Sequence, residues 1–436
     1  MELDTLHWYR EQLNEMGYRG WLANYNMLKD QHYNLIRTEA DYVAMNSYHD
    51  HPVRYSDGSE LMQQRSSIGT AGQVFRDFAS TRLAGKPMII TEHGHVYWNR
   101  YRYEQAFVTG AYAAFQGFDG ITCHASPFSL REGVVTRSFG LFTDPIGLAA
   151  EYLTFFAYVR GDVTEARTSV RIGINAGDVR KSADARSGLS PAQTRLALMT
   201  GFSVECTEDG RPQLPARKRE LLLDRNGSTQ VVTESSGFSR TVENAGDATA
   251  DVALLKRSGI LPESNRSDGS HLFESETGEL FMDTSRNFLS VNTPRLQGVC
   301  AEAGTTAELA DFEIREMSRP GNLAVVAIDG MKPIREAERL TVVYATDALA
   351  SGMECAGPER EVRFKAGGLP TLLRTGVFTV ALRNRQAEKL QLYPLDLAGN
   401  RLKKIEPVAV EGDRAVFRVD TARDGVSLFF EVVAEK

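Results

Sequence analysis

Apolar runs that end in polar clusters alternate with helical patterns over the first third of this 436-residue chain, and this alternation constrains the fold most. Four strands are expected: GWLANY from Gly20, DYVAMNSYHDHP from Asp41, MIIT from Met88 and GITC from Gly120. Such alternation builds parallel sheets that carry functional groups at the carboxyl ends of their strands. Because a closed (β/α)8 barrel needs eight strands, we predict a half (β/α)8 barrel of about four β/α units over residues 1–160.

The pattern changes after residue 160. Ser190 to Gln193 form a capping box with proline at the first helical position, which predicts a helix from Pro191 to about Val204. Beyond residue 226, short alternating runs are separated by Gly, Asp, Asn and Ser, which favours antiparallel strands. The predicted fold class is α/β plus all-β. A helix-containing linker and β-sandwich domain are expected over 161–366, and a small β-sandwich domain over 367–436.

Composition excludes several classes of function. The 50 basic and 57 acidic side chains give a net charge of −7 and form no basic cluster, so nucleic acid is not an expected partner. No stretch approaches 18 apolar residues, so no membrane association is expected. The four cysteines lie far apart without metal-ligand or disulfide spacing, which fits a reducing compartment. The amino end has no secretory-signal pattern, so we predict a cytoplasmic location if the chain is complete, and we expect no cofactor.

The strongest catalytic candidate is Glu92, which ends the apolar strand before Gly94. A carboxylate on the rim of a sheet is held by a rigid element, and glycine lets the backbone turn sharply past it. Such a carboxylate can attack the anomeric carbon of a sugar or stabilise an oxocarbenium-like transition state. A solvated glutamate in a loop is an equally weighted interpretation of the local pattern.

A second polar cluster, Asn46 to His51, ends another strand of the same set. Asn46 and Tyr48 could donate hydrogen bonds that orient the carboxylate, and His49 could contact a substrate. Consecutive histidines also suggest a metal, but consecutive residues do not project to one point, so no metal site is expected. A metal-dependent hydrolase remains a third alternative, with four histidines as its ligands: His49, His51, His93 and His95.

Aromatic and amide side chains that suit a sugar follow the other strands. Asn24 and Asn26 end the first predicted strand and offer bidentate hydrogen bonds. Trp98 lies in an aromatic loop after Glu92 and is the best candidate for stacking on a sugar ring. His93, and His124 after the last predicted strand, complete the expected substrate-binding rim, although a buried histidine is as plausible for His124.

These residues together resemble a known family. ITEHGHVYWN, followed by YEQAFVTGAYAAFQGFDGIT, is similar to the seventh strand, seventh helix and eighth strand of the clan A retaining glycoside hydrolases of the cellulase and β-galactosidase type. WLANYN resembles the fifth strand, and ETGELFMDTSRNFLSVNTPRLQGV resembles the β-domain that trails such barrels. The resemblance implies cleavage of a β-linked glycan with Glu92 as nucleophile. It also implies that Tyr48 lines the sugar subsite, with Asn46 standing where a histidine is usual.

One part of the family pattern is missing. A retaining enzyme of this clan needs an acid/base glutamate after an asparagine at the end of its fourth strand, and strands one to four are absent here. Asn14-Glu15 matches this Asn-Glu motif in sequence but lies at the end of the first predicted helix. Loss of a general acid removes about 10²–10⁴ in rate. A catalytically silent carbohydrate-binding or assembly protein is therefore the alternative function.

The strand count also predicts a partner. A four-stranded open sheet leaves two edges unpaired, which proteins usually cover. Two chains related by a twofold along the barrel axis would close eight strands and place two copies of Glu92 across one mouth. We therefore expect a homo-oligomer that closes the barrel, with an oligosaccharide or polysaccharide as its ligand.

Overall fold

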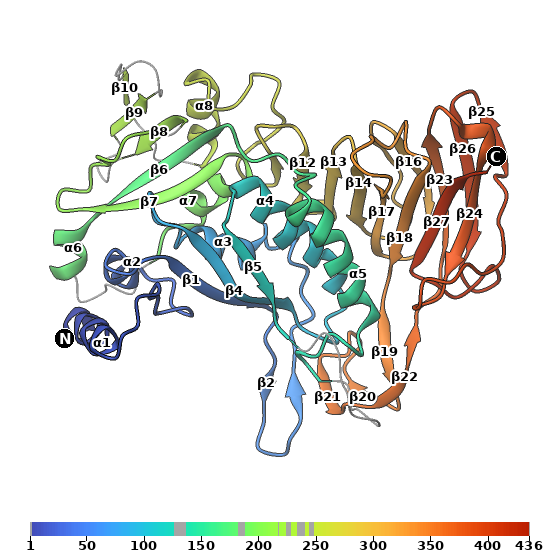
Figure 1. The fold of residues 1–436 in the computed structure, drawn as a ribbon, viewed down its shortest axis with the longest axis horizontal. Helices are drawn as coiled ribbons and strands as arrows, with labels where there is room; N and C mark the ends of the chain where they lie inside the picture. The colour runs from blue at the N-terminus through green and yellow to red at the C-terminus, as the bar shows by residue number, and fades with distance from the viewer. Residues whose placement is uncertain are drawn as a thin grey trace.

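The protein is described here by a computed structural model, which covers residues 2–125, 137–181, 188–216, 218–223, 228–232, 240–243 and 248–435. It combines helices with several sheets, so the mixed α/β fold class is as predicted. Figure 1 shows a first sheet in blue, a second in green and two antiparallel sheets in orange and red. Within the described ranges, no helix is long and apolar enough to cross a membrane.

The first part is a parallel sheet of three strands in the order β1-β4-β5. Val43 and Ile90 of this sheet and Phe75 and Phe107 of the helices belong to one buried apolar cluster, which holds the two layers together. The strands are β1 (Val43–His49), β4 (Met88–His95) and β5 (Gly120–Cys123). The helices are α1 (Glu2–Glu15), α2 (Gln31–Arg37), α3 (Gln73–Ala79), η1 (Arg102–Glu104), η2 (Ala106–Ala111) and α4 (Tyr112–Gln116).

The segment GWLANY, predicted as the first strand, is irregular. Its neighbourhood does run beside β1, because the carbonyl of Asn26 accepts a hydrogen bond from the amide of Asn46. However, Tyr25 has a φ of 63°, a left-handed conformation that interrupts an extended strand. The first sheet therefore has three parallel strands in the described chain, and the prediction of four was wrong.

The second part is a five-stranded sheet in the order β10-β9-β8-β6-β7, of which β7, β6 and β8 are parallel. The predicted capping box at Ser190 and Gln193 is present, but the helix ends at Leu198, because the residues from Gly201 pair with β6 as a strand. The strands are β6 (Thr168–Asn175), β7 (Gly201–Thr207), β8 (Arg219–Leu223), β9 (Ser228–Val232) and β10 (Arg240–Glu243). The helices are α6 (Ala176–Lys181), α7 (Pro191–Arg195), η4 (Leu196–Leu198) and α8 (Ala248–Arg257).

The third part consists of two antiparallel sheets with a shared apolar core. The eight-stranded sheet is β11 (Leu272–Glu274), β12 (Leu280–Asp283), β13 (Phe288–Asn292), β14 (Leu296–Ala301), β17 (Gly321–Ala327), β18 (Arg339–Ala345), β27 (Phe429–Ala434) and β24 (Leu390–Leu395). The five-stranded sheet is β15 (Ala307–Glu308), β16 (Phe312–Met317), β23 (Val377–Arg383), β26 (Arg414–Asp420) and β25 (Ala409–Glu411). Two short 3-10 helices, η5 (Thr284–Arg286) and η6 (Ala387–Lys389), connect strands of this part.

The predicted domain boundary at Gly367-Gly368 does not divide this core. Strand β23 pairs with β16, and β27 pairs with β18, so strands from both sides of residue 367 alternate in the same sheets. Residues 377–434 therefore complete the β-structure that begins near residue 272 and do not form a separate sandwich. The sequence pattern identifies antiparallel strands but contains no information about which distant strand each one pairs with.

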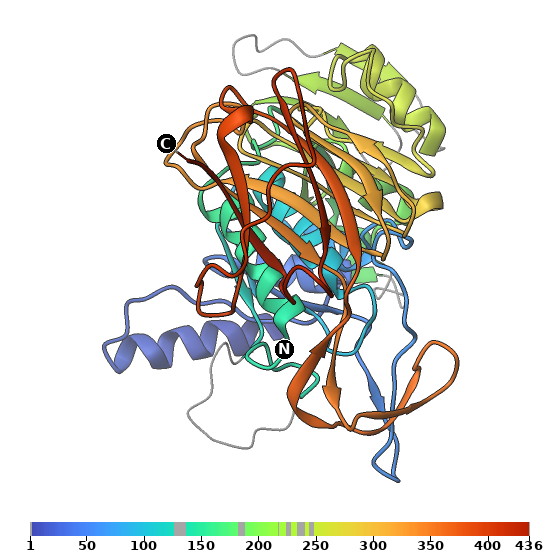
Figure 2. The same ribbon diagram turned by 90° about the vertical axis from the view of Figure 1, so that its right-hand side faces the viewer.

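A β-arm, residues 348–373, leaves the third part and reaches the first (Figures 1 and 2). It contains β19 (Ala348–Ser351), β20 (Glu354–Ala356), β21 (Val362–Lys365) and β22 (Gly368–Leu373). Strand β21 pairs with β3 (Glu60–Leu61), which pairs with β2 (Val53–Arg54), so the arm and a hairpin of the first part share one sheet. The figures show this shared antiparallel sheet projecting away from the rest of the molecule.

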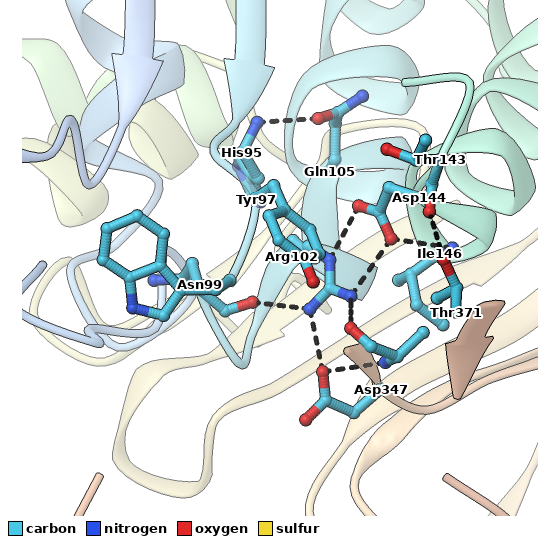
Figure 3. A network of polar contacts seen from close by, with 12 residues as sticks. His95, Tyr97, Asn99, Arg102, Gln105, Thr143, Asp144, Ile146, Asp347 and Thr371 are labelled. Atoms are coloured by element: carbon cyan, nitrogen blue, oxygen red, sulfur yellow. Dashed lines mark hydrogen bonds and ion pairs between the residues drawn. The ribbon is translucent and has the colours of Figure 1, made fainter. Parts of the chain in front are cut away.

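A buried arginine joins the first and third parts (Figure 3). Arg102 is 1% exposed. Its Nε donates to Asp144 Oδ2 at 2.7 Å, and its Nη1 donates to Asp347 Oδ1 at 2.8 Å. Asp144 also caps α5 (Pro145–Thr154), which continues as the π-helix η3 (Phe155–Val159). Two carboxylates from distant segments are thus held by one planar cation, which suits the fork geometry of arginine.

Removing the Arg102 charge should destabilise the protein strongly. In an Arg102→Met variant, Asp144 would remain buried without its cation and Asp347 would keep only its ion pair with Arg360, so we expect a loss of about 3–5 kcal/mol in the free energy of unfolding, measured by urea denaturation. Arg385→Met is the matched control, since Arg385 is 73% exposed beside Glu336. Its loss should stay below about 1 kcal/mol. Equal effects of the two substitutions would contradict this role of Arg102.

Glu104 should make stability depend on pH. Burial raises the pKa of Glu104 from 4.5 to about 7, although hydrogen bonds from Ser66, Ser67 and Ile68 to its oxygens oppose this shift. The folded protein therefore keeps this proton in a pH range where the unfolded chain has lost it. The stabilisation is complete below pH 4.5 and disappears as the pH rises through 7, a change of about 3 kcal/mol. In urea titrations from pH 5 to 8.5, the free energy of unfolding of wild type should fall by about 3 kcal/mol relative to that of Glu104→Gln, and parallel profiles would refute it.

Candidate active site at the carboxyl ends of the parallel strands

Glu92 lies near the carboxyl end of β4, opposite Asn46 of β1. Its side chain is 37% exposed, so the carboxylate reaches solvent. The Tyr48 hydroxyl donates a hydrogen bond to Glu92 Oε2, and His124 Nδ1 lies 3.9 Å from the same oxygen. The hydrogen bond expected between Tyr48 and the carboxylate is therefore present. Three neighbouring parallel strands bring these side chains together at one edge of the sheet.

Aromatic rings surround this carboxylate, and we call Tyr48, His51, Glu92, His124 and Phe139 the Glu92 cluster. The ring centroids of Tyr48 and Phe139 are 5.0 Å apart, and those of Tyr48 and His124 are 5.8 Å apart. His51 packs on Phe139 with a centroid distance of 5.2 Å. An exposed carboxylate beside aromatic rings is an arrangement that can contact both the apolar face and the anomeric carbon of a sugar.

The electrostatics of the pair keep Tyr48 in its phenol form. Burial, and then the hydrogen bond to the Glu92 carboxylate, raise the pKa of Tyr48 above its usual range. The phenol therefore acts as a hydrogen-bond donor at neutral pH and fixes the direction of Oε2. A donor on one oxygen leaves the second carboxylate oxygen available for a reacting carbon.

Asn46 is the partner of Glu92 in the sheet, and most of its side chain is buried. It is 6% exposed, and its Oδ1 accepts a hydrogen bond from Thr91 Oγ1 at 2.6 Å. The residue therefore braces β1 against β4 beside Glu92. Its role as a substrate contact stays a prediction.

Asn24 and Asn26 lie on the irregular segment before β1, and both are exposed. Asn24 Oδ1 accepts a hydrogen bond from the Tyr25 amide at 2.8 Å, while Asn26 uses its carbonyl to hold β1. Over the ranges that the structure describes, no hydrogen bond joins either amide side chain to the Glu92 cluster. The structure therefore does not bring Asn24 and Asn26 to the Glu92 carboxylate, contrary to the prediction.

His49 and His93 point away from the Glu92 cluster, which corrects their assignment to the substrate rim. Successive side chains of a strand face opposite sides, so the neighbours of Tyr48 and Glu92 must be turned inward. His49 is 7% exposed, and its Nε2 contacts the Arg65 carbonyl at 2.7 Å. His93 is 1% exposed, and burial lowers its pKa to about 4, so its imidazole is neutral.

Trp98 is buried completely and cannot stack on a ligand. Its Nε1 donates to the Arg360 carbonyl of the β-arm at 2.9 Å, and the Arg363 guanidinium lies 4.0 Å from its ring centroid. Arg363 in turn donates to Glu60. The prediction that Trp98 stacks on a sugar was wrong. The β-arm, more than 250 residues away in sequence, covers its ring.

Sequence reasoning missed three residues near the site. Phe139 supplies the central ring of the Glu92 cluster, and nothing in its local sequence distinguishes it. Cys123 and Glu151 lie behind β4 with His93. Cys123 could have been found only from the register of the two strands, because β4 and β5 must be aligned before Cys123 is seen to lie beside His93.

A second carboxylate is not in contact with Glu92 in the described part of the chain. Glu15, which belongs to the Asn-Glu pair that resembles the acid/base motif, is exposed at the end of α1. Figure 1 shows α1 at the margin of the molecule, outside the three strands. Among the described residues, the site therefore has one strand-end carboxylate whose hydrogen-bond and ion-pair partners are Tyr48 and His124, and no second carboxyl group is joined to it.

Searches of protein-family models, of curated proteins and of solved structures find no match for this chain. Function must therefore be inferred from the geometry of the Glu92 cluster.

Replacing Trp98 should affect stability. Trp98→Phe keeps an aromatic ring but removes the 2.9 Å hydrogen bond to the Arg360 carbonyl and leaves only the 3.4 Å hydrogen bond from Gln64, so we expect a loss of about 1–3 kcal/mol in the free energy of unfolding. Trp21→Phe is the control, because Trp21 is 65% exposed and should change stability by less than about 0.5 kcal/mol. Urea denaturation of both variants measures the difference. A Trp98→Phe protein as stable as wild type would contradict the structural role.

Proposed function

We propose that this protein acts on a β-linked glycan, with Glu92 as the carboxylate that faces the anomeric carbon. The observation that carries this proposal is the hydrogen bond from Tyr48 to Glu92 at the carboxyl ends of adjacent parallel strands. The exposure of Glu92 and the rings of His124 and Phe139 support it, because a sugar needs both access and an apolar surface. The resemblance of ITEHGHVYWN to the seventh strand of clan A glycosidases gives independent support.

In the proposed reaction, one Glu92 oxygen attacks the anomeric carbon or stabilises its positive charge as the glycosidic bond breaks. Tyr48 holds the other oxygen and prevents the carboxylate from rotating. The leaving oxygen must gain a proton, and a general acid contributes about 10²–10⁴ in rate. No second carboxyl group among the described residues is joined to Glu92, so a group other than a paired carboxylic acid must supply this proton.

We further propose that the three β/α units are part of a (β/α)8-type barrel, and that the two antiparallel sheets correspond to the trailing β-sandwich of such proteins. The parallel order β1-β4-β5 with covering helices supports the first part of this proposal. Strands β1 and β5 form the outer edges of the described sheet. A second copy of the chain that pairs with these edges would add strands and bring a second Glu92 to the mouth.

One observation favours a different function. Among the described residues, Glu92 has no second carboxyl group joined to it, which is what a catalytically silent carbohydrate-binding or assembly protein would show, since such a protein needs the aromatic surface but no paired acid. Binding and hydrolysis make different demands on Glu92, so a single substitution can distinguish them.

The test is turnover of a panel of aryl β-glycosides, together with binding of oligosaccharides by calorimetry. If the protein is a hydrolase, Glu92→Gln should lower kcat at least about 100-fold without loss of binding. Tyr48→Phe should lower kcat less, by roughly 10-fold, because it removes only an orienting hydrogen bond. Glu15→Gln is the control and should retain wild-type activity.

Two results would redirect the proposal. If wild type and Glu92→Gln are equally inactive yet both bind oligosaccharide, the silent binding function is correct. Wild-type turnover that Glu92→Gln does not reduce would refute the assignment of Glu92.

A further inference from the structure

A second cluster of chemically reactive side chains lies behind the Glu92 cluster. His93 of β4 is paired with Cys123 of β5 in the parallel register, and Glu151 of α5 joins them. One possible ligand atom from each of these three residues lies within 4.8 Å of those of the other two. The cluster therefore connects two neighbouring strands of the first sheet with a helix.

His93 is the unusual member. It is 1% exposed, and neither of its ring nitrogens has a hydrogen-bond partner. A buried polar group without a partner costs about 1–3 kcal/mol, so native proteins rarely leave one unsatisfied. Its ligand atom lies within 4.8 Å of a thiol and a carboxylate.

Gln105 holds the other two side chains in position. Its Nε2 donates to Glu151 Oε1 at 2.7 Å and to Cys123 Sγ at 3.5 Å. Its Oε1 accepts a hydrogen bond from the His95 amide at 2.7 Å, which Figure 3 shows. Outer residues that fix the ligands in this way are common around metal ions in proteins.

We propose that His93, Cys123 and Glu151 bind a zinc ion. An imidazole nitrogen, a thiolate sulfur and a carboxylate oxygen form a donor set that zinc accepts in tetrahedral sites. Zinc–ligand bonds of about 2.0–2.3 Å require the three donors to approach one another by roughly 1 Å, which side-chain rotation can supply. The Cys123 thiol loses its proton to water when the sulfur binds zinc, and a water molecule takes the fourth position.

The proposed ion would have a structural role. Side chains alternate along β4, so His93 faces the helices while Glu92 faces solvent. Zinc would clamp β4, β5 and α5 directly behind Glu92 and His124 and would not contact a ligand bound at the Glu92 cluster. The inference goes beyond the glycan proposal and stands whether or not that proposal is correct.

The experiment titrates Zn²⁺ into the metal-free full-length protein with a competing chromophoric chelator, and follows the thermal midpoint in parallel. Wild type should bind one Zn²⁺ and gain thermal stability as the Zn²⁺ concentration rises. Cys123→Ser and Glu151→Gln should each weaken binding by more than about 100-fold, since loss of an outer-shell partner alone costs 10–100-fold. Cys355→Ser is the matched control, because Cys355 lies in β20 of the β-arm, and it should bind as wild type does.

Binding of Co²⁺ provides a second readout. The wild-type complex should show a thiolate-to-cobalt charge-transfer band that Cys123→Ser lacks and Cys355→Ser retains. Glu151→Gln preserves the size of the side chain, so it tests the site even if the cysteine variant fails to fold. The inference is overturned if wild type binds no Zn²⁺, if the Co²⁺ complex lacks the thiolate band, or if Glu151→Gln binds Zn²⁺ as tightly as wild type.

Discussion

The fold depends on the buried ion pairs of Arg102. This side chain lies at the start of the helical segment behind β4, and its two carboxylate partners precede α5 and begin the β-arm. Breaking a buried ion pair leaves an uncompensated charge, so the segments that carry Asp144 and Asp347 are both held against Arg102. The interaction thereby fixes the helices behind the parallel sheet against the antiparallel sheets, and with them the position of the strand ends that carry Glu92.

The predicted site residues that the structure brings together are those whose position follows from the end of one strand. Glu92, Tyr48 and His124 follow apolar runs, and the edge of a parallel sheet brings them together. His49 and His93 were misplaced although strand alternation already required them to face the other way from their neighbours. Trp98 was misplaced for a different reason, because the segment that buries it lies at residues 360–363 and no local pattern reports on it.

The same limit explains the errors in the fold. Local periodicity predicted the three parallel strands and the antiparallel strands beyond residue 270. It also predicted a strand at GWLANY, where the left-handed conformation of Tyr25 interrupts an extended backbone. The separate carboxyl-terminal domain was an error of pairing, since β27 completes a sheet with β18 from the other side of the expected boundary. Strand type is a local property, whereas strand partners are set by contacts between distant residues.

The β-arm has a consequence for biosynthesis. A ribosome completes the first parallel sheet long before it makes residues 354–365, so Trp98 and the β2-β3 hairpin emerge without the strand that later covers them. Contacts of such long sequence separation form late and leave apolar surface open to aggregation in the meantime. Trp98 and the β2-β3 hairpin therefore stay uncovered during synthesis until the arm has emerged and closed over the tryptophan.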